Sequence, residues 1–129
     1  MSFLKVRNAH KSENTEDYLE LINDLINNNG EARIVEIANK LNVAQATANK
    51  TIKRLQLQGF IDKQPYRSIF LTEKGQKIAL SSKKRHEIVY KFLINLGVSK
   101  KIALADSEGI EHHVSKKTLD KMEKFNKKF

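Results

Sequence analysis

Residues 108–113 of the chain read EGIEHH, a pattern with the side-chain types and the spacing of a metal-binding group. Glu108, Glu111 and His112 stand at positions i, i+3 and i+4, which share one face of a helix. Two carboxylates this close repel each other, and a divalent cation that both can bind removes the repulsion. The competing interpretation is a solvated acidic patch beside surface histidines, which arises often by chance.

The available donor atoms limit which metal such a group would hold. The chain contains no cysteine, which excludes thiolate metal sites, disulfides and cysteine nucleophiles. Oxygen-rich ligation with one or two imidazoles suits manganese or ferrous iron better than a structural zinc ion. Further candidate ligands are Asp17 and Glu20, one turn apart on an earlier predicted helix, and His86 on a later one. Each of these alone is better explained as an ordinary surface or packed residue, and only the joint pattern indicates a site.

Between these segments lies the spacing of a helix-turn-helix. Residues 34–41 have a short apolar helical pattern, Asn42 and Val43 follow, and a second helix is predicted from about residue 45 to 58. The second helix carries donors and cations without an acidic residue, which suits phosphates and base edges. A merely solvated basic face is the alternative. The candidate DNA contacts on this helix are Gln45, Thr47, Asn49, Lys50, Lys53 and Arg54.

The segment after this helix predicts a β-hairpin. Residues 60–64 and 68–72 have the pattern of two short strands joined by residues 65–67. A hairpin placed directly after a helix-turn-helix indicates a winged helix, with Lys63 and Arg67 available to the phosphate backbone. This order of elements favours DNA binding over a solvated basic helix.

The rest of the chain is predicted to be helical. A first helix spans about residues 14–28 and follows a basic arm, residues 2–13, that has no clear period. After the wing, Thr72 caps a helix that runs to about residue 96, a second helix covers about residues 100–113, and Ser115 caps a third.

The fold class is therefore mainly α: a winged helix-turn-helix with a small β-hairpin wing, followed by an all-helical dimerisation and metal-binding lobe. We expect a DNA-binding domain with its N-terminal arm at residues 1–75, and the helical domain at residues 76–129. The helical domain has many apolar residues for its length, which predicts a homodimer interface.

The composition points to a polyanionic partner. Lysine and arginine total 24 against 15 acidic residues, a net charge of +9. Such a balance favours nucleic acid first and an anionic membrane surface second. No apolar run approaches the ~20 residues that cross a bilayer, and no signal peptide is evident. We therefore expect a cytoplasmic protein without a membrane partner.

Three motifs together resemble those of one known family. Residues 16–20 read EDYLE, residues 85–87 read RHE, and residues 108–113 read EGIEHH. Their order and spacing resemble the manganese-transport regulators of the diphtheria-toxin-repressor family, and the resemblance extends from about Val6 to Leu119. It includes GEAR at residues 30–33 and FLT at residues 70–72.

The resemblance implies two manganese ions in each subunit. It assigns Asp17 and His86 mainly to one ion, Glu20 and His112 to the other, and Glu108 with Glu111 to both. Iron-responsive relatives carry methionine and cysteine at the positions of Asp17 and Glu108, and the carboxylates found here are harder ligands that favour manganese. Fe²⁺ and other divalent ions are alternative occupants.

The implied function is a manganese-responsive transcriptional regulator that represses metal-uptake genes when metal-bound. A homodimer would bind a palindromic operator with its recognition helices roughly 34 Å apart. The alternatives are a winged-helix regulator that ignores metal and, less favoured, a dinuclear metallohydrolase. The chain offers no obvious substrate-binding loop, so we do not expect an enzyme. One departure from the family is Ala44 at a capping position, which costs ~1 kcal/mol locally.

Overall fold

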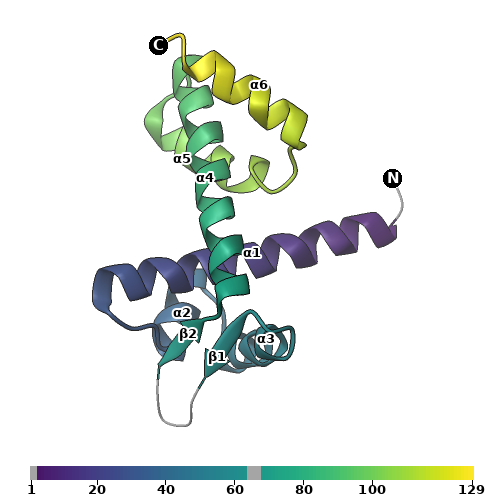
Figure 1. Cartoon of the computed structure of the whole chain (residues 1–129), viewed down its shortest axis with the longest axis vertical. Helices are drawn as coiled ribbons and strands as arrows, with labels where there is room; N and C mark the ends of the chain where they lie inside the picture. The colour runs from purple at the N-terminus through teal and green to yellow at the C-terminus, as the bar shows by residue number, and fades with distance from the viewer. Residues whose placement is uncertain (1–2, 64–67) are drawn as a thin grey trace. The chain divides into compact units, whose positions relative to one another are not determined.

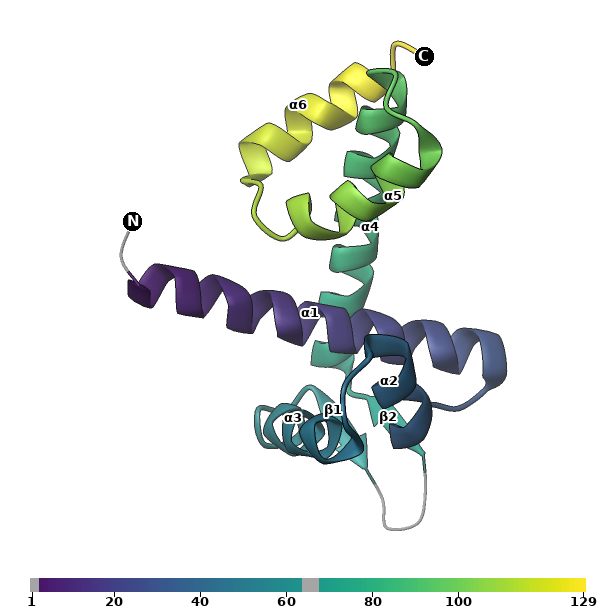
Figure 2. The same cartoon turned by 180° about the vertical axis from the view of Figure 1, so that it is seen from behind.

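The computed structural model describes the backbone of residues 3–63 and 68–129 and the side chains of residues 14–63 and 68–129. Figures 1 and 2 show these parts from two opposite sides. Within them the elements are α1 (Phe3–Asn29), α2 (Ile34–Leu41), α3 (Gln45–Leu57), β1 (Ile61–Lys63), β2 (Ile69–Leu71), α4 (Glu73–Asn95), α5 (Lys100–Ile110) and α6 (Lys116–Asn126). The predicted fold class is confirmed: mainly α, with a hairpin directly after a helix-turn-helix.

The chain forms two compact units. Residues 14–80 make the winged-helix unit, and residues 1–13 with 81–129 make the helical unit. Helices α1 and α4 each contribute residues to both units.

The core of the winged-helix unit follows from the apolar stripe of α1. Tyr18, Leu19, Ile22 and Leu25 are buried there at helical spacing. They belong to one cluster with the buried residues of α2, α3 and the hairpin, which are Ile37, Ala38, Ala48, Ile52, Leu55, Ile61 and Ile69. Burial of this cluster fixes which face of α3 remains at the surface.

The turn between α2 and α3 is tight and regular. Asn42 adopts the left-handed conformation with φ 55°, which asparagine tolerates well. The backbone N–H of Val43 then donates to the carbonyl of Ala38 at 3.0 Å. Ala44 precedes α3 in an extended conformation and makes no side-chain capping bond. As expected for alanine at this position, α3 therefore begins without a side-chain cap.

The hairpin is anchored at both ends. Strands β1 and β2 pair antiparallel, with Ile61 opposite Leu71, and the N–H of Ile69 donates to the carbonyl of Ala32 at 3.0 Å. The Thr72 hydroxyl donates to the Gly59 carbonyl at 2.7 Å and accepts from the Gly75 N–H at 3.2 Å. Thr72 thus caps α4, as predicted, and joins the start of α4 to the end of α3. Each strand begins one residue later than predicted, and β2 ends at Leu71, one residue before the predicted end.

The helical unit is held by caps and by packing of α6 on α4, whose C-terminal ends meet in Figure 2. Ser99 and Ser115 cap α5 and α6 as predicted, each accepting a backbone N–H. The rings of Phe92 and Phe125 meet edge to face with centroids 5.3 Å apart. The amide of Asn126 also donates to the Ile88 carbonyl at 3.1 Å, which secures α6 against α4.

Two helix boundaries differ from the prediction. Helix α1 begins at Phe3, within the basic arm that was predicted without a clear period. Extending an existing helix adds one hydrogen bond for each residue ordered, so no apolar period is required there. Helix α5 ends at Ile110, and residues 111–113 form a turn. The chain must leave the helix early because Ser115 needs an extended backbone to cap α6.

Candidate metal centre and DNA-binding surface

The local structure of α5 places Glu111 in the interior of the helical unit. Ala103, Ser107 and Glu111 follow one another at intervals of four residues, and all three are buried. Glu111 is the C-cap of α5, and its backbone N–H donates to the Ser107 carbonyl at 3.2 Å. The small side chains before Glu111 allow this face of α5 to pack closely.

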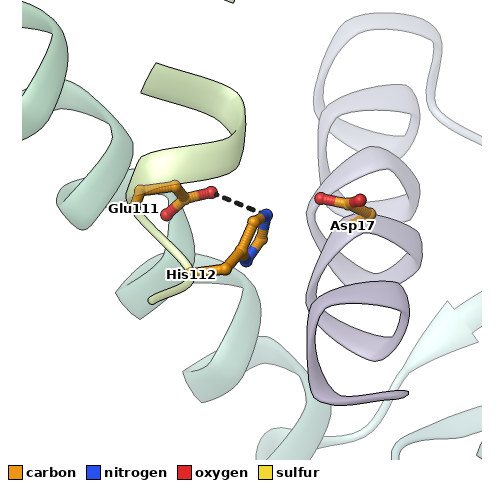
Figure 3. A group of neighbouring side chains, drawn as sticks. All are labelled: Asp17, Glu111 and His112. Atoms are coloured by element: carbon orange, nitrogen blue, oxygen red, sulfur yellow. Dashed lines mark ion pairs between the residues drawn. The ribbon is translucent and has the colours of Figure 1, made fainter. Parts of the chain in front are cut away.

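Glu111 and His112 form a buried ionisable pair. Their side chains are each 1% exposed, and Nε2 of His112 lies 3.3 Å from Oε1 of Glu111. Figure 3 shows this pair in stick form, together with Asp17 on α1. The Ser82 hydroxyl donates to Oε1 of Glu111 at 3.4 Å, and Nε of Arg85 lies 3.9 Å from Oε2. A buried carboxylate needs such compensation, because removal from water strongly disfavours an isolated charge.

The remaining predicted ligands occupy different environments. His86 is partly buried on α4, where Nε2 lies 3.3 Å from the Ser107 hydroxyl. Glu108 is exposed on α5, and Asp17 and Glu20 are partly buried on the segment of α1 that belongs to the winged-helix unit. Within the described residues of the helical unit, the ligand pair in direct contact is therefore Glu111 and His112.

The donor set in the helical unit fits a divalent cation. It offers a buried carboxylate, two imidazoles and an exposed carboxylate, and the chain has no thiolate. Oxygen donors and neutral imidazoles suit manganese and ferrous iron. A cation would also compensate the buried charge of Glu111.

The exposed face of α3 matches the predicted DNA-contacting face. Ala48, Ile52 and Leu55 are buried, which turns the opposite side of the helix to solvent. The exposed members of the predicted set are Gln45, Thr47, Asn49, Lys50 and Lys53.

Arg54 is in a different position from the other residues of the predicted set. It is partly buried, and its Nη1 donates to the Thr15 hydroxyl at 3.1 Å and to Oε1 of Gln58 at 3.0 Å. At least part of its guanidinium therefore joins α3 to α1. Lys63 is partly exposed at the end of β1, and the predicted contact Arg67 lies outside the described residues.

Sequence reasoning missed the polar residues that surround the ligands. Ser82, Arg85 and Ser107 contact Glu111 or His86, and none was predicted to have a role. One signal was present in the sequence. Ser82 stands four residues before His86, and Ser107 four residues before Glu111, so each serine shares a helix face with a candidate ligand.

A winged helix followed by a helical unit with buried carboxylate and imidazole groups defines a class, the metal-responsive DNA-binding regulators. Residues 10–69 match the family model described as the N-terminal DNA-binding domain of the iron-dependent repressors. Residues 72–129 match its metal-binding and dimerisation domain. The chain belongs to the iron-dependent repressor family.

Known relatives support the same assignment. The chain is 51% identical over 126 residues to the transcriptional regulator MntR of Escherichia coli O6:H1, covering 98% of this chain and 81% of that protein. It is 53% identical over 118 residues to MntR of Salmonella typhimurium, covering 92% of this chain and 75% of that protein. The predicted membership in the manganese-regulator branch is confirmed.

Solved structures resemble the fold along most of the chain. A manganese-dependent transcriptional repressor in complex with manganese superimposes with a TM-score of 0.80 at 26% identity, covering 88% of this chain. The manganese regulator SloR gives a TM-score of 0.76 at 29% identity over 86% of this chain. The chain spans about half the length of these two proteins, 52% of each.

These findings establish a metal-responsive DNA-binding repressor that binds divalent metal and forms a homodimer. The helical unit has several exposed apolar side chains: Ile94, Leu96, Ile102, Leu104 and Ile110. In the part of the chain that the structure describes, no helix has the length and apolarity needed to cross a membrane.

Proposed function

We propose that this repressor responds to manganese and, when metal-bound, represses genes for manganese uptake. The observation that carries the proposal is the buried Glu111–His112 pair, 3.3 Å apart, in a chain without thiolate ligands. Hard oxygen donors with imidazole rank manganese and ferrous iron above softer metals. The names of two structurally similar proteins, a manganese regulator and a manganese-dependent repressor, agree with this ranking.

Each subunit holds two ions in this proposal, with Mn²⁺ as the principal occupant and Fe²⁺ as an alternative. The helical unit supplies His86, Glu108, Glu111 and His112, and the α1 segment supplies Asp17 and Glu20. Bound metal would supply positive charge that offsets the repulsion among these carboxylates. Glu111 and His112 are the two ligands that are already in contact with each other. Ser82 and Arg85 hold the Glu111 carboxylate in place.

The dimer binds a palindromic operator through α3 and the wing. Exposed donors on α3 contact base edges and phosphates, and Lys63 with Arg67 contacts the backbone beside the groove. Two-fold symmetry of the dimer requires the matching symmetry in the operator. Metal-bound protein favours the DNA-binding arrangement of the dimer, and metal-free protein populates it less.

In this proposal residues 1–75 form the DNA-binding domain, and residues 76–129 form the metal-binding and dimerisation domain. The protein acts in the cytoplasm as a regulator and not as an enzyme. A hydrolase that uses the same metal ligands is not favoured, because the family of the chain consists of transcriptional repressors.

The test is a titration of metal-stripped protein with manganese at fixed salt, measuring affinity for DNA from neighbouring promoters by fluorescence anisotropy. We expect a tightening of about 5- to 150-fold, the usual range for allosteric coupling. Glu111→Gln should lose this response. Asp120→Asn, which removes an equal charge from an exposed position on α6, should keep it.

DNA affinity that is identical with and without manganese would refute the metal switch. Manganese-dependent hydrolysis without DNA binding would favour the enzyme instead.

A further inference from the structure

Two polar contacts meet at the Ser107 hydroxyl in the helical unit. Its oxygen lies 3.1 Å from the carbonyl oxygen of Leu104 and 3.3 Å from Nε2 of His86. Ser107 is completely buried, so water does not compete for these contacts. The positions of the hydrogen atoms therefore follow from the three heavy atoms.

The Ser107 hydroxyl has one proton to donate. The Leu104 carbonyl can only accept, so its contact with Ser107 requires that the hydroxyl proton point toward it. Such a bond from a helical serine to the carbonyl three residues earlier is a common local pattern. The Ser107 oxygen is then left to accept, and Nε2 of His86 must carry the hydrogen. The opposite assignment would set two oxygen lone pairs against each other at 3.1 Å.

We infer that Ser107 is a positioning residue that holds His86 in its Nε2–H tautomer. In this tautomer Nδ1 carries the free lone pair and is the metal-binding atom. The inference rests on the proposed function, because it assigns the atom through which His86 takes part in that site. A metal-binding histidine usually donates its other ring N–H to an acceptor, which fixes the tautomer and the ring orientation. In this chain the acceptor is a buried serine hydroxyl.

Ser107 also connects His86 with the second ligand of the helical unit. Its backbone carbonyl accepts the N–H of Glu111 at 3.2 Å, while its side chain contacts His86. A single residue thus orients one ligand on α4 and places another at the end of α5.

The first arm of the test needs no substitution. The ¹⁵N chemical shifts of both ring nitrogens of His86 are measured in the metal-free full chain, about two pH units above the ordinary histidine pKa of about 6.5. His86→Gln identifies the signals among the four histidines. We expect Nε2 to be protonated and Nδ1 to show the shift of an unprotonated nitrogen.

The second arm uses two variants at position 107. Ser107→Ala removes the acceptor and should give a mixture of His86 tautomers, with manganese affinity about 10- to 100-fold weaker, as for loss of an outer partner of a metal ligand. Ser107→Thr keeps a hydroxyl that can bond to the same helical carbonyl, and should restore the single tautomer and most of the manganese affinity.

The outcomes separate this inference from the function on which it rests. An Nδ1–H tautomer in the wild-type chain would overturn the inference, even if manganese binds. An unchanged tautomer and unchanged manganese affinity in Ser107→Ala would also overturn it, since Ser107 would then act through packing alone. The expected tautomer without any manganese binding would refute the proposed function and Nδ1 as a ligand, while the Ser107–His86 contact would stand.

Discussion

Lys50 is the cation of α3 that points most directly away from the core, and its loss should change the salt dependence of DNA binding. At about 100° per residue, Lys50 lies about 160° around the helix from both Ala48 and Ile52, which are buried. The side chain is exposed, and α3 carries no acidic residue in its first turn to neutralise it. Lys50→Gln removes the charge and keeps a good helix former.

The size of the effect follows from the symmetry of the dimer. One substitution removes two cations per dimer, and each phosphate contact contributes about 0.9 to the slope of log affinity against log salt. The slope should therefore fall in magnitude by about 1.8. A fourfold rise in salt would then weaken the variant about 12-fold less than it weakens the wild-type protein.

The assay is fluorescence anisotropy with saturating manganese at several salt concentrations. Lys91→Gln is the matched control, because Lys91 is exposed on the part of α4 in the helical unit and loses the same charge. Its slope should equal that of the wild-type protein. Equal slopes for the two variants would refute the assignment of the outer face of α3 to DNA.

Two further predictions concern the supports of the site and of the fold. Ser82→Ala removes the hydroxyl that donates to Glu111 at 3.4 Å, and calorimetry should show manganese affinity reduced about 10- to 100-fold; unchanged affinity would contradict this role. Gly75→Ala would place a Cβ against the carbonyl oxygen of Phe60, so denaturant unfolding should show a loss of about 1–3 kcal/mol. Gly109→Ala is the control, because its Cβ would lie in open space on α5, and it should be neutral or stabilising by about 0.5–1 kcal/mol. Equal losses of stability in the two variants would contradict the steric argument.

The winged helix was predictable because local signals agree with the final packing. The apolar pattern of residues 34–41, the turn at Asn42 and the hairpin signal after α3 each indicate one element, and their order indicates the motif. Capping by Thr72, Ser99 and Ser115 was equally local, because each hydroxyl accepts a backbone N–H three residues later.

The environment of the ligands was less predictable because it depends on contacts through space. The contact of Ser107 with His86 joins residues 21 positions apart, and that of Ser82 with Glu111 joins residues 29 positions apart. Arg54 is predicted to contact DNA from its place on α3, whereas its bond to Thr15, which joins residues 39 positions apart, could not be predicted. Residue type and helical spacing indicate which groups share a face, but not which groups of another helix meet them.

In the proposed function metal binding and DNA binding are coupled in one protein, and thermodynamic linkage tests this coupling most directly. Manganese affinity would be measured by calorimetry for the free dimer and for the dimer saturated with operator DNA, at the same salt. We expect DNA to tighten manganese binding by the same factor by which manganese tightens DNA binding. Manganese affinity that does not change when DNA is bound would contradict this coupling. The protein would then be a winged-helix protein whose metal site does not influence its DNA affinity.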